Sequence, residues 1–231
     1  MKYLIALTLI ATVAQCRETS LPTDGVIGRV NGNALIEHIE ADGSKKTRAA
    51  RAGEKVQAGD TIITAEKSTV IFYVTGAKME VQENSRFVYE RTGDDKQVYL
   101  QSGNAWTMVE PLGGNRRFSL RTPNSVAAVR GTKFFTFTDG ANTGTCHCEG
   151  KIAFKNNASG KEEVNDRDYI MYFRQDKAVK VFVEELKKIG LPIGHNHSAL
   201  NDSELGKKVN LTPAQLQKMQ AFVDKKFAAL R

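Results

Sequence analysis

LRTPNSVAAVRGTKF, at residues 120–134, is the stretch of sequence that says most about the fold. Pro123 has no backbone N–H to contribute to a ladder, so it marks the start or the edge of a strand. Gly131 allows a bend or bulge that a Cβ atom would obstruct. Arg130 could bind carbonyl oxygens or a carboxylate at that bend. A role in folding explains these residues better than a ligand site does, and the stretch predicts β structure that bends near Gly131.

The same β character extends from Gly25 to about Val183. Short segments rich in Val, Ile, Phe, Tyr and Thr alternate with turn signals made of Gly, Asp and Asn; examples are residues 61–64, 69–74, 86–89, 98–100 and 117–120. Side chains on a strand alternate between its faces, so Val98 and Leu100 are expected in a core and Tyr99 on the other face. The pattern predicts an all-β fold: a sandwich, a roll or a solenoid-like body of many short strands.

Residues 184–231 are expected to form a small α-helical C-terminal appendage. The segment 181–189 predicts a short helix, or a passage from strand to helix, that ends at Gly190. A loop is expected over residues 193–202, and one helical turn over residues 203–208.

The last predicted helix has a clear beginning. Thr212 is a good N-cap, Pro213 suits the first helical position, and Gln215 completes a capping box. The helix then carries one apolar stripe with Phe222 beside it, made of Leu216, Met219, Val223, Phe227 and Leu230. We expect this stripe to cover the β body; a partner helix is the alternative.

The N-terminus predicts export. Residues 3–13 carry no charge and follow a positively charged start. Because a helix needs about 20 residues to span a bilayer, this apolar run is too short, and residues 1–15 are interpreted as a signal peptide.

A lipid anchor is predicted at Cys16. The tripeptide Ala14-Gln15-Cys16 resembles a bacterial lipobox, although Gln15 stands where most bacteria use Gly or Ala. Residues 16–24 would then be a polar tether, and acyl chains on Cys16 would attach the protein to the inner or the outer membrane. Secretion with an unmodified Cys16 is the alternative.

Charge and motifs exclude several classes of function. The 231-residue chain has 33 Lys+Arg against 26 Asp+Glu, a net charge of +7, but its basic residues are scattered among acidic ones. This is typical of an ordinary solvated surface, so a nucleic-acid partner is not expected. A nucleophile elbow, a metalloprotease helix motif and a phosphate loop are all missing, and we predict that the protein is not an enzyme.

Three segments together resemble the FecR domain family. Residues 56–64 look like the family's early G-D-x-I-x-T turn and strand, and residues 98–106 look like its L-x-x-G-x-x-W/R hairpin. Residues 120–134 are similar to its most specific motif, T-P-x-x-x-x-x-V-R-G-T-x-F. The matching positions are Thr122, Pro123, Val129, Arg130, Gly131, Thr132 and Phe134. The resemblance implies a FecR-type β domain over residues 25–183.

The resemblance implies little about function by itself. The name-giving members of the family are inner-membrane regulators that pass a signal from an iron-siderophore receptor to a sigma factor. They also carry a transmembrane helix and a cytoplasmic anti-sigma segment, and this chain shows neither. Our first hypothesis is therefore a lipid-anchored binding, scaffold or signalling module, with its domain in the periplasm or at the cell surface and with a protein or glycan partner. Trp106, Tyr99 and Tyr89 could stack on a glycan, although such aromatic residues are more often core or cross-strand pairs.

Cysteine and histidine residues suggest a second hypothesis. Cys146 and Cys148 would lie on one face of a strand, with His147 pointing away, and His195 and His197 would share a face in the same manner. If the two pairs meet, two thiolates and two imidazoles suit tetrahedral Zn²⁺, and thiolates also suit Cu(I). A disulfide and two simply packed thiols are equally good interpretations. No cofactor is certain, and a metal here would be structural because all four positions are taken by protein ligands.

Overall fold

The computed structural model describes residues 25–114, 116–167, 169–191 and 211–230. The signal peptide, Cys16, the tether, the predicted turn at 203–208, and His195 and His197 lie outside the described residues. Seventeen strands and two helices occupy the described part: β1 (Gly25–Asn31), β2 (Ala34–Ile39), β3 (Lys45–Ala49), β4 (Lys55–Val56), β5 (Thr61–Thr64), β6 (Thr69–Val74), β7 (Ala77–Val81), β8 (Arg86–Arg91), β9 (Asp95–Val109), β10 (Arg117–Arg121), β11 (Ser125–Val129), β12 (Thr132–Thr138), β13 (Asn142–Glu149), β14 (Ile152–Asn156), β15 (Glu162–Asn165), β16 (Tyr169–Arg174), β17 (Lys177–Phe182), α1 (Val183–Lys188) and α2 (Pro213–Ala228). The predicted all-β fold with a small helical appendage is confirmed.

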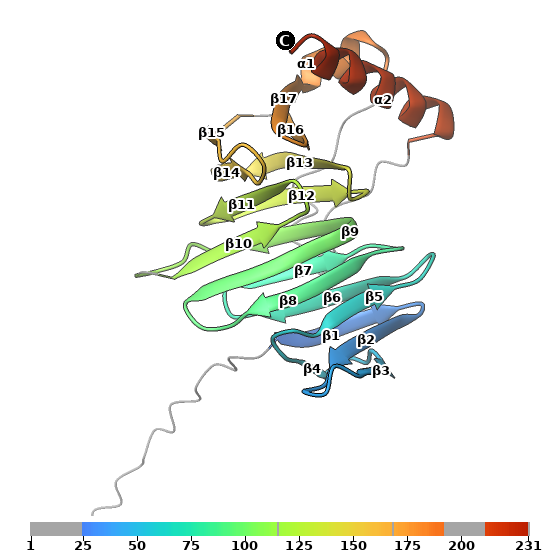
Figure 1. Cartoon of the computed structure of the whole chain (residues 1–231), viewed down its shortest axis with the longest axis vertical. Coiled ribbons are helices and arrows are strands. Elements are labelled where there is room, and N and C mark those ends of the chain that lie inside the picture. Colours follow the sequence, from blue (N-terminus) through green and yellow to red (C-terminus); the bar gives the residue numbers. More distant parts are fainter. Residues whose placement is uncertain (1–24, 115, 168, 192–210, 231) are drawn as a thin grey trace, which may run out of the picture.

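The strands form two layers that share β9 (Figure 1). In the layer that we call helix-bearing, the order is β4-β1-β6-β7-β9-β12-β13-β16-β17. In the layer that we call open, the order is β3-β2-β5-β8-β9-β10-β11-β14-β15. β10 runs parallel to β9, and the other recorded pairings are antiparallel.

β9 joins the two layers because it is long enough to pair in both. Its residues 95–102 pair with β8 and β10 in the open layer. Its residues 103–109 pair with β7 and β12 in the helix-bearing layer. The strand changes layer at Gly103, where φ is +91°.

The core lies between the layers and is closed by aromatic rings. Phe72 of the helix-bearing layer meets Phe87 and Tyr89 of the open layer edge to face, with ring centroids 6.0 and 5.4 Å apart. At the other end Phe154 meets Phe173 at 5.5 Å. Each fully buried ring contributes about 1.5–3 kcal/mol through the hydrophobic effect.

The predicted alternation along the strands is confirmed. Val98 and Leu100 are fully buried in this core, and Tyr99 between them is half-buried on the other face. Tyr89 is fully buried and Trp106 lies in a second apolar cluster, so the aromatic residues pack inside the protein rather than forming an exposed platform.

The helices cover the outer face of the helix-bearing layer at its β17 end (Figure 1). Here Leu186 of α1 and Val223 and Phe227 of α2 pack on Val181 and its neighbours, forming the second cluster. The α2 stripe is thus buried in its middle and half-buried at Met219 and Phe222, whereas Leu216 and Leu230 are exposed. The prediction that the stripe covers the β body is confirmed for the C-terminal half of the helix.

The predicted helix boundaries also hold. Thr212 accepts a hydrogen bond from the Gln215 amide and Gln215 reaches back to the Thr212 amide, so the capping box forms. α1 follows β17 directly and gives way to Gly190 in the left-handed region, as the segment 181–189 predicted. Neither helix in the described part of the chain has the length and apolar character to cross a bilayer.

Candidate functional site

Thr122 stabilises the fold at the N-terminal end of the signature segment. It is 1% exposed and lies in the turn between β10 and β11. Its Oγ1 accepts hydrogen bonds from the Ser125 amide at 3.0 Å and from the Thr143 hydroxyl at 3.0 Å. Because Thr143 belongs to β13 of the other layer, Thr122 ties the two layers together at this end of the sandwich.

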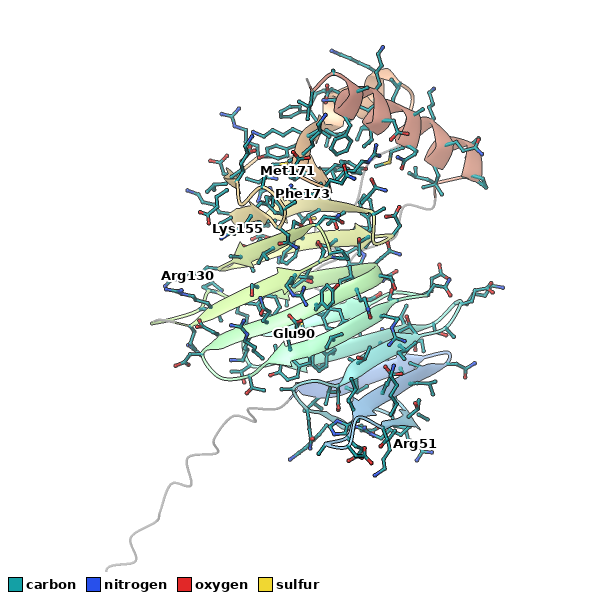
Figure 2. The ribbon with its side chains drawn as sticks, in the orientation of Figure 1. Arg51, Glu90, Arg130, Lys155, Met171 and Phe173 are labelled. Atoms are coloured by element: carbon teal, nitrogen blue, oxygen red, sulfur yellow. The ribbon has the colours of Figure 1, made fainter. Side chains whose placement is uncertain are left out.

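The other end of β11 is just as closely fixed. Gly131 has φ +64° in the turn to β12, and Thr132 donates a hydrogen bond to the Lys151 carbonyl at 3.0 Å. Val129 and Phe134 on either side of this turn are buried in the core. Arg130 is the one signature residue here whose polar side chain is exposed to solvent (Figure 2).

Arg130 belongs to a row of three cations across neighbouring strands. Phe118 pairs with Val129, and Val129 with Ile152, so one step further along the register sets Arg117, Arg130 and Lys151 side by side. Since Phe118, Val129 and Ile152 point into the core, the three cations point outward. Like charges directly opposite each other destabilise a sheet, so the row is not explained by folding alone.

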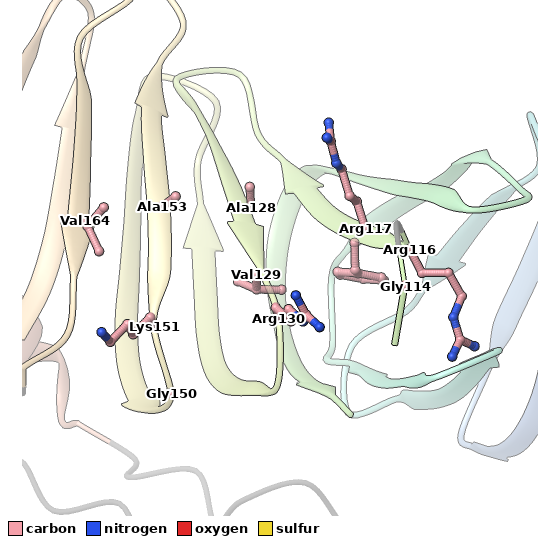
Figure 3. A pocket seen from close by; sticks show the side chains of 11 residues that line it. Gly114, Arg116, Arg117, Ala128, Val129, Arg130, Gly150, Lys151, Ala153 and Val164 are labelled. Atoms are coloured by element: carbon pink, nitrogen blue, oxygen red, sulfur yellow. The ribbon is translucent and has the colours of Figure 1, made fainter. Parts of the chain in front are cut away.

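The row borders a groove of about 790 Å³ on the open layer, which we call the basic groove (Figure 3). Arg116 adds a fourth cation, and in the view of Figure 3 its side chain and that of Arg117 extend in opposite directions. Ala128, Ala153 and the exposed Val164 supply apolar surface beside the charges.

The positive charge of the groove is weakly compensated. Within the described residues, none of Arg116, Arg117, Arg130 and Lys151 makes an ion pair, although Asp95 is next to Arg117 in the register. Burial lowers the pKa of the nearby Lys96 ammonium, and the charge of Arg116 acts in the same direction. An anion would therefore be attracted to this end of the open layer.

Residues 60–153, which run from the end of the β4–β5 turn into β14, match the family model described as FecR protein. The chain contains a FecR domain. All four cations of the basic groove, Arg116, Arg117, Arg130 and Lys151, lie in the matched span.

Solved structures give a more distant likeness. Two crystal structures of candidate anti-sigma factors from Parabacteroides distasonis ATCC 8503 are similar to this FecR-domain chain. The first is 16% identical with a TM-score of 0.48, over 69% of this chain and 71% of that one. The second is 14% identical with a TM-score of 0.47, over 71% of this chain and 92% of that one. No curated protein matches the sequence significantly.

Cys146 and Cys148 lie on one face of β13, as the sequence predicts, in the apolar cluster beneath the helices. Both are buried thiols in the structure. His147 points away from them and lies between the carbonyls of Gly150 and Arg167, at 2.7 and 3.0 Å. Among the described residues no group of three or more His, Cys, Asp or Glu side chains could hold a metal ion. The metal site that includes His195 and His197 stays a prediction, because those residues lie outside the described part.

The basic groove was not predicted from the sequence. Arg117, Arg130 and Lys151 are separated by 13 and 21 positions, and only the strand register aligns them. The signal available in the sequence was Arg130 itself, the one charged position of the signature.

Proposed function

We propose that this protein is a non-enzymatic binding and signalling module of the cell envelope, held at a membrane by lipid on Cys16, which receives an acidic segment of a partner protein in its basic groove. The observation that supports this function is the row of Arg117, Arg130 and Lys151 without ion-pair partners in the described residues. A partner that supplies carboxylates would offset the repulsion within the row.

The shape of the groove favours a peptide over a lipid surface. The groove is concave and combines cations with the apolar side chains of Ala128, Ala153 and Val164, the last of which is 59% exposed. A peptide that alternates acidic and small apolar residues can fill such a groove, whereas a flat bilayer surface meets a convex patch better.

The test measures binding of a fluorescent oligoglutamate peptide to the mature chain carrying Cys16→Ser, at low and at physiological salt. We expect Arg130→Ala with Lys151→Ala to weaken binding about tenfold, and we expect salt to weaken the wild type more than the variant. Lys161→Ala with Lys187→Ala is the matched control, because both are exposed lysines away from the groove. Equal binding by both double variants, or binding to anionic phospholipid vesicles but not to the peptide, would count against the proposal.

The lipid anchor needs its own test. Growth with radiolabelled palmitate should label the wild type and leave Cys16→Ser unlabelled, and the variant should move from the membrane fraction to the soluble fraction. A wild-type protein that is unlabelled and soluble would rule the anchor out without affecting the groove.

A second candidate function is metal binding by Cys146, Cys148, His195 and His197. Leu191 packs in the same cluster as both cysteines, and His195 follows it by four positions. An extended chain spans about 3.3–3.6 Å per residue, so these histidines are within reach of the thiols. Purified wild type should contain stoichiometric zinc or copper that Cys146→Ser with Cys148→Ser lacks; a metal-free wild type would exclude this function.

A further inference from the structure

A second pocket lies on the opposite face of the molecule from the basic groove, between α2 and the helix-bearing layer. It has a volume of about 290 Å³, and we call it the α2 pocket. Its lining comes from β9, from the β12–β13 hairpin, from β16 and from α2: Gly103, Asn104, Phe137, Thr138, Asp139, Asn142, Tyr172, Arg174, Gln220 and Val223. The pocket is large enough for one sugar ring and too small for most drug-sized ligands.

A hydrogen-bond network fixes one wall of the α2 pocket. Arg174 donates to Asn142 Oδ1 and to Asp224 Oδ1, each at 2.6 Å. Gln220 also donates to Asp224 Oδ1, at 2.9 Å, and Asn142 donates to Asp139. The network therefore connects the hairpin to the helix and holds several planar polar groups in place around the pocket.

Part of the hydrogen-bonding capacity at the pocket is unused by the described residues. The side-chain amide of Asn104 has no recorded partner there, and the carbonyl oxygen of Gln220 has none either. Tyr172 is 5% exposed, and its hydroxyl is closed to solvent with no hydrogen-bond partner among the described residues, so this hydroxyl is not a contact for a ligand in the pocket. The amide of Asn104 and the carbonyl oxygen of Gln220 are the groups that a ligand can use.

Two aromatic rings form the apolar part of the lining. Phe137 and Tyr172 meet edge to face with centroids 5.5 Å apart, and both pair across Gly144. A Cβ at position 144 would lie 2.1 Å from the Phe137 ring, so glycine is what allows the ring to lean over the strand.

The charges around the pocket disfavour an anionic ligand. Arg174 is paired with Asp224, and Asp139 accepts hydrogen bonds from Asn142, which carries no charge, so the described lining has one carboxylate in excess. Sugar hydroxyls both donate and accept hydrogen bonds, which suits the amides of Asn104 and Gln220. The apolar face of a sugar ring suits Phe137 and Tyr172.

From this combination we propose that the α2 pocket binds one residue of an uncharged envelope glycan. Asn104 and Gln220 hydrogen-bond the sugar hydroxyls, Phe137 and Tyr172 contact the apolar face, and α2 closes the site. The site is separate from the basic groove, so either can fail its test while the other stands.

Titration calorimetry with N-acetylglucosamine and with glucose tests this site, and glucuronate is the charged comparison. We expect saturable binding of at least one neutral sugar and no binding of glucuronate. Asn104→Ala and Gln220→Ala should each weaken binding about tenfold. Gln217→Ala is the matched control, because Gln217 is an exposed glutamine one turn from Gln220 on α2, and it should bind as the wild type does.

Tyr172→Phe separates the ring of Tyr172 from its hydroxyl. It keeps the ring that contacts the sugar and removes only a hydroxyl that is closed to solvent, so the variant should fold and bind the sugar as the wild type does. Absence of binding by both neutral sugars, or equal affinity in wild type, Asn104→Ala and Gln220→Ala, would overturn the proposal. Peptide binding in the basic groove should be the same in all of these variants.

Discussion

Thr122 and Thr107 are both buried threonines, and they differ in what their hydroxyls do. The Thr122 hydroxyl accepts from an amide and from another threonine. The Thr107 hydroxyl is buried on β9 and has no hydrogen-bond partner within the described part of the chain. The comparison isolates the contribution of the signature threonine, because the two side chains are equally buried.

We predict that Thr122→Val lowers the free energy of unfolding by about 1–3 kcal/mol, since it removes the side-chain acceptor of the Ser125 amide and breaks the link to Thr143, whose hydroxyl then has only Asn124 and Thr138 as acceptors. Thr107→Val should be neutral or slightly stabilising, because it removes a polar group that is already unsatisfied. Urea titration of the two variants and the wild type measures both values. Equal losses would show that burial, and not the hydrogen bonds, explains why the signature has threonine here.

At the scale of the element, α2 depends on its cap. Thr212 and Gln215 satisfy each other's backbone amides at the start of the helix. Thr212→Ala should reduce the stability of the first turn by about 1 kcal/mol, and Thr212→Ser should retain it because serine caps equally well. Hydrogen exchange of the Gln215 and Leu216 amides, which both donate to Thr212, measures this change; equal exchange in both variants would contradict the role of the cap.

Acid should loosen α2 from the β body. The hydrogen bond from Arg174 lowers the pKa of Asp224. Burial acts to raise the pKa of Glu185, but the hydrogen bonds from Lys226 and from the Phe182 amide, together with the charges of Lys226 and Lys188, outweigh it and the pKa is lowered. A carboxyl whose pKa is depressed on folding stabilises the folded state above its ordinary value, near about pH 4, and loses that effect as the pH falls through the folded value.

We therefore predict that α2 amides lose protection relative to those of β8 as the pH is lowered below about 4. The effect should be small, because exposed ion pairs contribute about 1 kcal/mol or less. Asp224→Asn with Glu185→Gln should make the ratio of α2 to β8 exchange independent of pH in this range. A wild-type ratio that stays constant to lower pH would show that these pairs do not hold the helix.

The elements were easier to predict than the site. Alternation at Val98 and Leu100, and the cap at Thr212, are local patterns, so the sequence reveals strands and helix ends directly. The basic groove depends on register between Arg117, Arg130 and Lys151, and the α2 pocket depends on where α2 docks. Both are long-range consequences of pairing that no short window of sequence contains.

At the scale of the whole molecule the fold depends on β9, which among the described strands is the one that pairs in both layers. Its crossing point, Gly103, has φ +91°, and a Cβ there would lie 2.6 Å from the Ser85 Cα atom. Gly140 has the same φ of +91° but nothing within 4 Å of the site of a Cβ. Both Gly140→Ala and Gly103→Ala put an alanine at a strained positive φ, and Gly103→Ala also creates a clash with the backbone of Ser85.

We predict that Gly140→Ala lowers the free energy of unfolding by about 1 kcal/mol. Gly103→Ala should lower it clearly more, because Ser85 cannot move without shifting the strand pairing around it. Since β9 couples the layers, both should lose stability together in Gly103→Ala. Fluorescence of Trp106, the single tryptophan, reports the helix-bearing layer, and amide exchange of β5 and β8 reports the open layer. The two probes should follow one unfolding transition in wild type and variant alike. Separate transitions would mean that each layer folds on its own and that β9 only links them.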